Sequence, residues 1–245
     1  MVTVEFKKVA NLSKLKKPII IVGFPGTGLV GSVAASHIID VFKLDFAGHI
    51  ASEEFAPLAA IHNYTPMPAA RFHYSEKLNL IVVLSEMSIP VAAAGPLADQ
   101  IFEFSKSVGA KEILCVGGIA LKEAKNEVYI IASDKSMVQD AITKKIAKPI
   151  REGATTGVTG LLLAKGTLAH FPVVTLLAES SDEYLDADAA SRVLKAVGKM
   201  LNLEINTERL DKEAKGTKES MIKSKVSKRG PGMNESGSIG GSMYG

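Results

Sequence analysis

The sequence has little of several residue types, and each shortage excludes a class of protein. It contains no Trp, one Cys and only 6% aromatic residues in 245 positions. A single cysteine, Cys115, cannot form an internal disulfide, so we expect a protein of a reducing compartment, the cytoplasm. The five His residues are scattered, without the His and Cys spacings of known sites, so no metal is predicted.

An excess of charge is also missing from most of the chain. The net charge is +3, but seven of the 29 Lys and Arg residues and four of the 26 Asp and Glu residues lie from Asp211 onward. The first 210 residues are therefore neutral, with 22 residues of each sign. A neutral body predicts no nucleic-acid-binding face.

Residues 18–39 carry no charge and are long enough to span a bilayer. Pro25 and four glycines interrupt this stretch, and charged residues precede it, so neither a membrane helix nor a signal peptide is predicted. Ile19–Val22 instead predicts a buried strand, and from Leu29 onward apolar residues recur at helical spacing. Strand, glycine loop and helix form the first half of a βαβ unit. We therefore expect a three-layer α/β fold, with a mostly parallel sheet and helices on both faces.

Apolar patterns continue through most of the chain. Strands are predicted near residues 2–6, 46–50, 69–74, 78–84, 113–116, 128–132 and 173–177, and those at 69–74 and 78–84 are expected to form a hairpin or strand pair around Ser75-Glu76-Lys77. Helices are predicted from about 97 to 108, after Asp134, within 153–166, after Asp186, and from Asn206 to about Lys215. Lys, Ser, Gly and Pro then dominate without apolar periodicity. We expect one α/β domain at residues 1–215 and a flexible tail at 216–245.

The glycine loop raises the question of a ligand. Gly26, Gly28 and Gly31 fit the dinucleotide spacing G-x-G-x-x-G, and the loop, with Thr27, could hold a phosphate at the start of a helix. That fingerprint also needs an acid at the end of the next strand, and none falls there. A tight turn that lets the helix pack on the strand explains the glycines equally. We expect no cofactor and keep the ligand loop as an alternative.

Acidic residues follow two predicted strands, where α/β enzymes often place their active sites. They are Glu53–Glu54 and Ser85–Glu86, and Arg71 and His62 could join them. No nucleophile and base stand in a recognisable pattern, so salt bridges, loop caps or subunit contacts are the preferred interpretation. No catalytic residue is predicted.

Three segments carry a resemblance to a known family. They are Gly-Phe-Pro-Gly-Thr-Gly-Leu-Val-Gly at 23–31, Ala-Ser-Glu-Glu-Phe at 51–55 and Gly-Gly-Ile-Ala at 117–120. Together they resemble the proteasome assembly chaperones of archaea and eukaryotes, over most of residues 15–205. The resemblance implies a nucleoside-phosphorylase-like fold without enzyme activity, in a proteasome assembly chaperone or activator.

The end of the chain adds to this resemblance. Some archaeal members end in a hydrophobic-Tyr-x (HbYX) motif that docks on the proteasome α-ring, and Met243, Tyr244 and Gly245 occupy its places here. The resemblance thus implies proteasome α subunits as partners. We also expect a homo-oligomer, because apolar surface is predicted around residues 55–61 and 91–97.

Two other functions stay open from the sequence. One is a nucleoside-phosphorylase-like or nucleotide-binding enzyme that uses the loop Gly26–Gly31. The other is a plain interaction module for a different complex.

Overall fold

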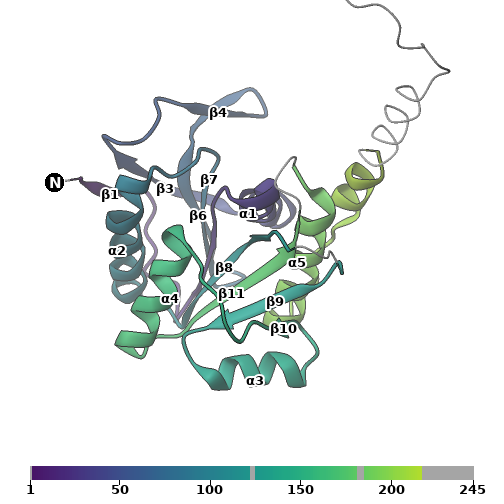
Figure 1. Cartoon of the computed structure of the whole chain (residues 1–245). Helices are drawn as coiled ribbons and strands as arrows, with labels where there is room; N and C mark the ends of the chain where they lie inside the picture. The colour runs from purple at the N-terminus through teal and green to yellow at the C-terminus, as the bar shows by residue number, and fades with distance from the viewer. Residues whose placement is uncertain (1, 122–124, 181–184, 217–245) are drawn as a thin grey trace, which may run out of the picture.

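The computed structural model describes residues 2–121, 125–180 and 185–216 (Figure 1). Its strands are β1 (Val4–Lys8), β2 (Ile19–Gly23), β3 (Asp45–Ser52), β4 (Ala59–His62), β5 (Thr65–Pro68), β6 (Ala70–Ser75), β7 (Leu80–Ser85), β8 (Glu112–Ile119), β9 (Val128–Ala132), β10 (Lys148–Pro149) and β11 (Val173–Glu179). Its helices are the 3-10 turn η1 (Thr27–Leu29), α1 (Val30–Phe42), α2 (Val91–Ser107), α3 (Lys135–Thr143), α4 (Gly157–Ala169) and α5 (Ala187–Leu201), and residues 208–216 are also helical.

The main sheet of the described residues is mixed, which corrects the expectation of a mostly parallel one. Its strand order is β1-β3-β6-β7-β2-β8-β11-β9-β10. The central strands β7, β2, β8 and β11 are parallel, but β1, β3 and β6 pair antiparallel on one side, and β9 pairs antiparallel with β11 on the other. Among the described residues, β4–β5 and β6–β7 are antiparallel because short turns join them, whereas β1–β3, β3–β6 and β9–β11 pair across intervening elements. With the separate β4–β5 hairpin, five of the nine pairings among the described residues are antiparallel.

Helices cover both faces of the sheet (Figure 1), because its central strands bury alternate residues on opposite sides. Ile21, on β2, packs in a core with α1 and α5, whereas Ile20 and Val22 pack in a second core with α2 and α4. The same alternation holds in β7 and β8. The strands and helices predicted from the sequence occur near most of the predicted residue ranges. None of the helices in the described ranges is long and apolar enough to cross a membrane.

Candidate functional site

The glycine loop after β2 is held against the body from several sides. Gly28 has a φ of +61°, and a Cβ there would collide with Oγ of Ser180. The carbonyl oxygen of Gly28 accepts a hydrogen bond from the backbone N–H of Asp186, at 3.0 Å. A Cβ on Gly31 would lie 2.5 Å from the carbonyl oxygen of Phe24 and 2.6 Å from that of Val116. These glycines let α1 approach β2 and β8 closely, which favours the packing interpretation.

The strand order also differs from that of a dinucleotide-binding site. In such sites the strand after the first helix lies next to the first strand, so that its acid reaches the ribose. Here β2 lies between β7 and β8, while β3, the strand after α1, lies beyond β6 and β7. The carboxylate beside the loop is that of Asp186, which accepts hydrogen bonds from Ser180 Oγ and the Ala189 N–H, both at 2.9 Å. Its negative charge opposes a phosphate at Gly28.

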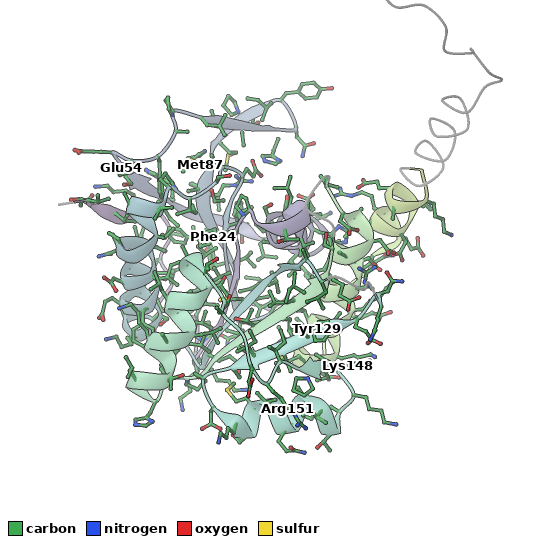
Figure 2. All side chains as sticks on the ribbon, viewed as in Figure 1. Phe24, Glu54, Met87, Tyr129, Lys148 and Arg151 are labelled. Carbon is green, nitrogen blue, oxygen red and sulfur yellow. The ribbon has the colours of Figure 1, made fainter. Side chains whose placement is uncertain are left out.

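A cleft of about 300 Å³ nevertheless opens beside this loop, at the carboxyl ends of the parallel strands. Phe24 to Thr27 form one wall, and Thr155 to Thr159, at the start of α4, form another; Figure 2 labels Phe24 near the centre of the molecule. None of the described residues that line the cleft has an ionisable side chain. They offer hydroxyl and backbone groups, which can bind a ligand but cannot perform general acid–base catalysis at neutral pH.

The structure does bring His62, Arg71 and Glu86 together, as the sequence suggested. Glu86 Oε1 lies 2.8 Å from Arg71 Nη2 and 2.8 Å from His62 Nε2, and both nitrogens can donate to it. Arg71 also donates to the carbonyl of Pro68, at 3.1 Å. His62 ends β4 and Pro68 ends β5, so this cluster fastens the β4–β5 hairpin to β6 and β7. Its charges are mutually satisfied, which fits the predicted structural role.

Other candidates stay apart from this cluster. Glu53 and Glu54 lie in an exposed turn after β3, and Figure 2 shows Glu54 at the periphery of the molecule. Cys115 is fully buried in β8, and burial raises the pKa of its thiol to about 12, so it is an unreactive core residue. Among the described residues, no group of three or more His, Cys, Asp or Glu could hold a metal ion.

The hairpin itself was missed from the sequence. Residues 59–68 contain two prolines and no regular alternation, yet they form an antiparallel pair with a tight turn at Asn63 and Tyr64, both with positive φ. Asn in a left-handed conformation is a common hairpin-turn signal, whereas Tyr there is unusual. Met243, Tyr244 and Gly245, the predicted docking residues, lie outside the described residues.

The fold and the cleft define the class of protein. It is an α/β protein with a closely packed glycine turn after its central strand and a cleft lined by uncharged residues. The chain belongs to the PAC2 family, which matches residues 20–224. It is 31% identical to the uncharacterised protein MJ0106 of Methanocaldococcus jannaschii, over 82% of each chain.

Two solved structures from Pyrococcus furiosus are similar over nearly the whole chain. PbaA, an archaeal homologue of proteasome-assembly chaperone, has a TM-score of 0.83 and 26% identity, with 92% of each chain covered. PbaB, an archaeal proteasome activator, has a TM-score of 0.78 and 29% identity, with 91% of this chain and 98% of PbaB covered. The likeness covers more than nine-tenths of this chain in both cases.

Proposed function

We propose that this protein is a proteasome assembly chaperone or activator that binds proteasome α subunits through Met243, Tyr244 and Gly245. The observation that carries the proposal is the whole-chain likeness to PbaA and PbaB. It coincides with a hydrophobic-Tyr-x ending in this sequence. The protein acts as a binding partner and not as an enzyme, since the uncharged cleft offers no acid, base or nucleophile pair for phosphorylase-type chemistry.

The chemistry of the last three residues suits docking into a pocket. Tyr244 buries an aromatic ring while its hydroxyl finds a partner, and Met243 adapts to an irregular apolar groove. The carboxylate of Gly245 pairs with a lysine of the ring, a charge-assisted contact. Residues 217–242 serve as the tether, since a flexible chain of about 26 residues has a root-mean-square reach of roughly 25–30 Å.

Self-association of the body is the second part of the proposal. Leu58, Ile61 and Tyr64 of the hairpin region are 51%, 65% and 101% exposed, and Val91, at the start of α2, is 93% exposed. A lone two-stranded hairpin is only marginally stable in water, so an apolar one fixed to the body gains by being covered. Another copy of this chain covers it, and several tails per particle raise avidity for a ring.

A pull-down of purified α subunits tests the proposal. The full chain is expected to retain α subunits, and the chain lacking residues 243–245 is expected to lose them while keeping its circular dichroism spectrum. Equal retention by both would contradict docking through the tail. Equal retention of unrelated proteins by the full chain would support the plain interaction module instead.

A further inference from the structure

A second cleft, of about 540 Å³, lies at the β10 edge of the sheet. It forms where the chain after α3 and the short strand β10 face the C-terminal half of α5, with the start of β9 beside them; Lys148 marks this edge in Figure 2. None of the predicted functional residues lies here. The cleft is thus independent of the glycine loop and of the tail proposed above.

Among the described residues that line this cleft, basic side chains outnumber acidic ones, although the body of the protein is neutral. These residues include five cationic side chains and one carboxylate, which belong to Lys145, Lys148, Arg192, Lys195, Lys199 and Glu127.

Within the described part of the chain, three of these five cations form ion pairs. Lys148 pairs with Glu127 at 2.8 Å, and Lys195 pairs with Asp211 at 3.3 Å. Arg192 pairs with Asp188 one helical turn away. Lys145 and Lys199 have no ion-pair partner among the described residues, and both side chains are exposed. The cleft therefore presents uncompensated positive charge.

Apart from Asn126, the remaining described lining residues are apolar, and they indicate the class of ligand. Val128, Ile146, Ala147, Pro149 and Ala196 lie between the cations, and Ile142 at the rim is 37% exposed. A ligand that satisfies this surface needs aliphatic groups as well as negative charge.

The geometry favours separate carboxylates over a compact phosphate. Phosphate sites are built from backbone N–H groups at helix N-termini or from the rigid fork of arginine. Here α3 contributes Ile142 near its C-terminal end, and α5 contributes residues from its middle and last turns, so the described lining contains no helix N-terminus. The guanidinium of Arg192 is already engaged by Asp188 and by the carbonyl oxygen of Glu179. Flexible lysines on both rims can instead reach carboxylates spaced along an extended chain.

We propose that this cleft binds an acidic segment of a partner protein, in which carboxylates alternate with aliphatic side chains. Lys145 and Lys199 pair with carboxylates on opposite rims, and the aliphatic side chains cover Ile142 at the rim and Ala196 inside the cleft. Charge complementarity selects the occupant, and the interaction weakens as salt screens it. The proposal does not depend on docking by residues 243–245.

Fluorescence anisotropy with a defined probe tests this. The probe is a fluorescein-labelled peptide of three Glu-Leu-Glu-Ala repeats, titrated with the full chain at low salt. We expect saturable binding that Lys145→Glu combined with Lys199→Glu weakens at least about tenfold, because two attractive contacts become repulsive. The same peptide with Gln in place of Glu is expected to bind at least about tenfold more weakly to the parent.

Matched controls separate the cleft from general charge effects. Lys43→Glu with Lys77→Glu makes the same change in net charge outside the cleft, and Lys43, like Lys145, has a left-handed backbone. Lys223→Glu with Lys225→Glu does so in the tail. Both control pairs, and the chain lacking residues 243–245, are expected to bind like the parent.

Several results would overturn the proposal. They are absence of saturable binding, equal binding by the Lys145/Lys199 variant, or equal loss in either control pair. Displacement of the probe by ATP at lower concentrations than by the unlabelled peptide would also overturn it, and would assign the cleft to nucleotides. If the charge-reversed variant fails to fold, the pair Lys145→Gln and Lys199→Gln replaces it, with a several-fold loss expected.

Discussion

At the scale of single residues, buried polar groups decide how the outer strands are held. Arg71 is 3% exposed and relies on Glu86 for its counter-ion, while His73, on the same strand, is 7% exposed and neutral. Burial, with a smaller contribution from the charge of Arg71, lowers the pKa of His73 from 6.5 to about 4. His73 Nδ1 lies 3.2 Å from the carbonyl oxygen of Leu44, the residue before β3, and donates to it in the neutral form. The stability of this region therefore depends on the negative charge of Glu86 beside Arg71 and on His73 remaining neutral.

His73 is expected to make the fold acid-sensitive. Its folded pKa lies below its unfolded value, so the unfolded chain binds the proton more tightly. The stabilisation is complete above pH 6.5 and is lost as the pH falls toward 4, by about 3 kcal/mol in total. Urea unfolding at fixed protein concentration, from pH 7.5 to 4.5, measures this loss. His73→Phe should flatten the profile in this range; an unchanged pH dependence in that variant would assign the effect to other groups.

Glu86→Gln is expected to lower the free energy of unfolding by about 2 kcal/mol, because Arg71 is left buried without its counter-ion. The matched control is Glu54→Gln, an exposed side chain for which a change within about 0.5 kcal/mol is expected. Thermal unfolding of the two variants side by side measures the difference. Equal stability of both would show that the cluster with His62 does not hold the hairpin.

At the scale of elements, the junction of β2 and α1 is closely packed. Gly31 has no room for a side chain because backbone atoms of Phe24 and Val116 approach it. Gly28 is confined by Ser180 and hydrogen-bonded to Asp186, just before α5. The junction therefore serves to hold two helices and two strands together, with the uncharged cleft beside it.

Gly28→Ala is expected to destabilise the protein by about 2 kcal/mol or more, since an L-residue at positive φ is strained and the added Cβ meets Ser180. Gly26→Ala is the control, because no atom lies within 4 Å of its added Cβ. Calorimetry with nucleotides should show no micromolar site in the parent or in either variant. A saturable site that Gly28→Val abolishes would restore the nucleotide-binding alternative.

The central strands and most helices could be predicted from the sequence, because runs such as Ile19–Val22 and caps such as Asp134 and Asp186 are local signals. Strand order is not local. The β6–β7 pair was predicted as a hairpin and is confirmed, whereas the pairing of β3 with β6 and the return of β9 against β11 depend on long-range packing. The expectation of a mostly parallel sheet was therefore wrong for the outer strands. From the sequence, His62 and Arg71 could join the acids that follow two strands, and the structure brings both to Glu86, while Glu53 and Glu54 lie in an exposed turn. The basic cleft was not predicted, since its lysines come from segments far apart in sequence.

At the scale of the whole molecule, a sheet covered by helices on both faces presents two kinds of surface. An apolar hairpin projects from one side of the sheet (Figure 1), and a basic cleft lies at the opposite edge. PbaA and PbaB share the body over almost their whole length. We propose that the hairpin mediates self-association, and that the tail and the cleft bind partner proteins.

Ile61→Ser combined with Tyr64→Ser is expected to reduce self-association, because it removes the most exposed apolar side chains of the hairpin. Sedimentation velocity at micromolar concentration should show an oligomer for the parent and a smaller particle for the variant. Leu168→Ser, at an exposed position on α4, is the control and should sediment like the parent. A monomeric parent, or an oligomer unaffected by the hairpin variant, would contradict the proposed interface.

Docking by the end of the chain is tested most directly by the affinity of immobilised proteasome α-rings for three proteins. These are the parent, Tyr244→Ala, and a chain extended by one residue after Gly245. We expect saturable binding by the parent and at least about a hundredfold loss in both variants, with unchanged sedimentation, because one loses the aromatic anchor and the other moves the terminal carboxylate. Binding by both variants with the affinity of the parent would show that Met243, Tyr244 and Gly245 are not the docking site.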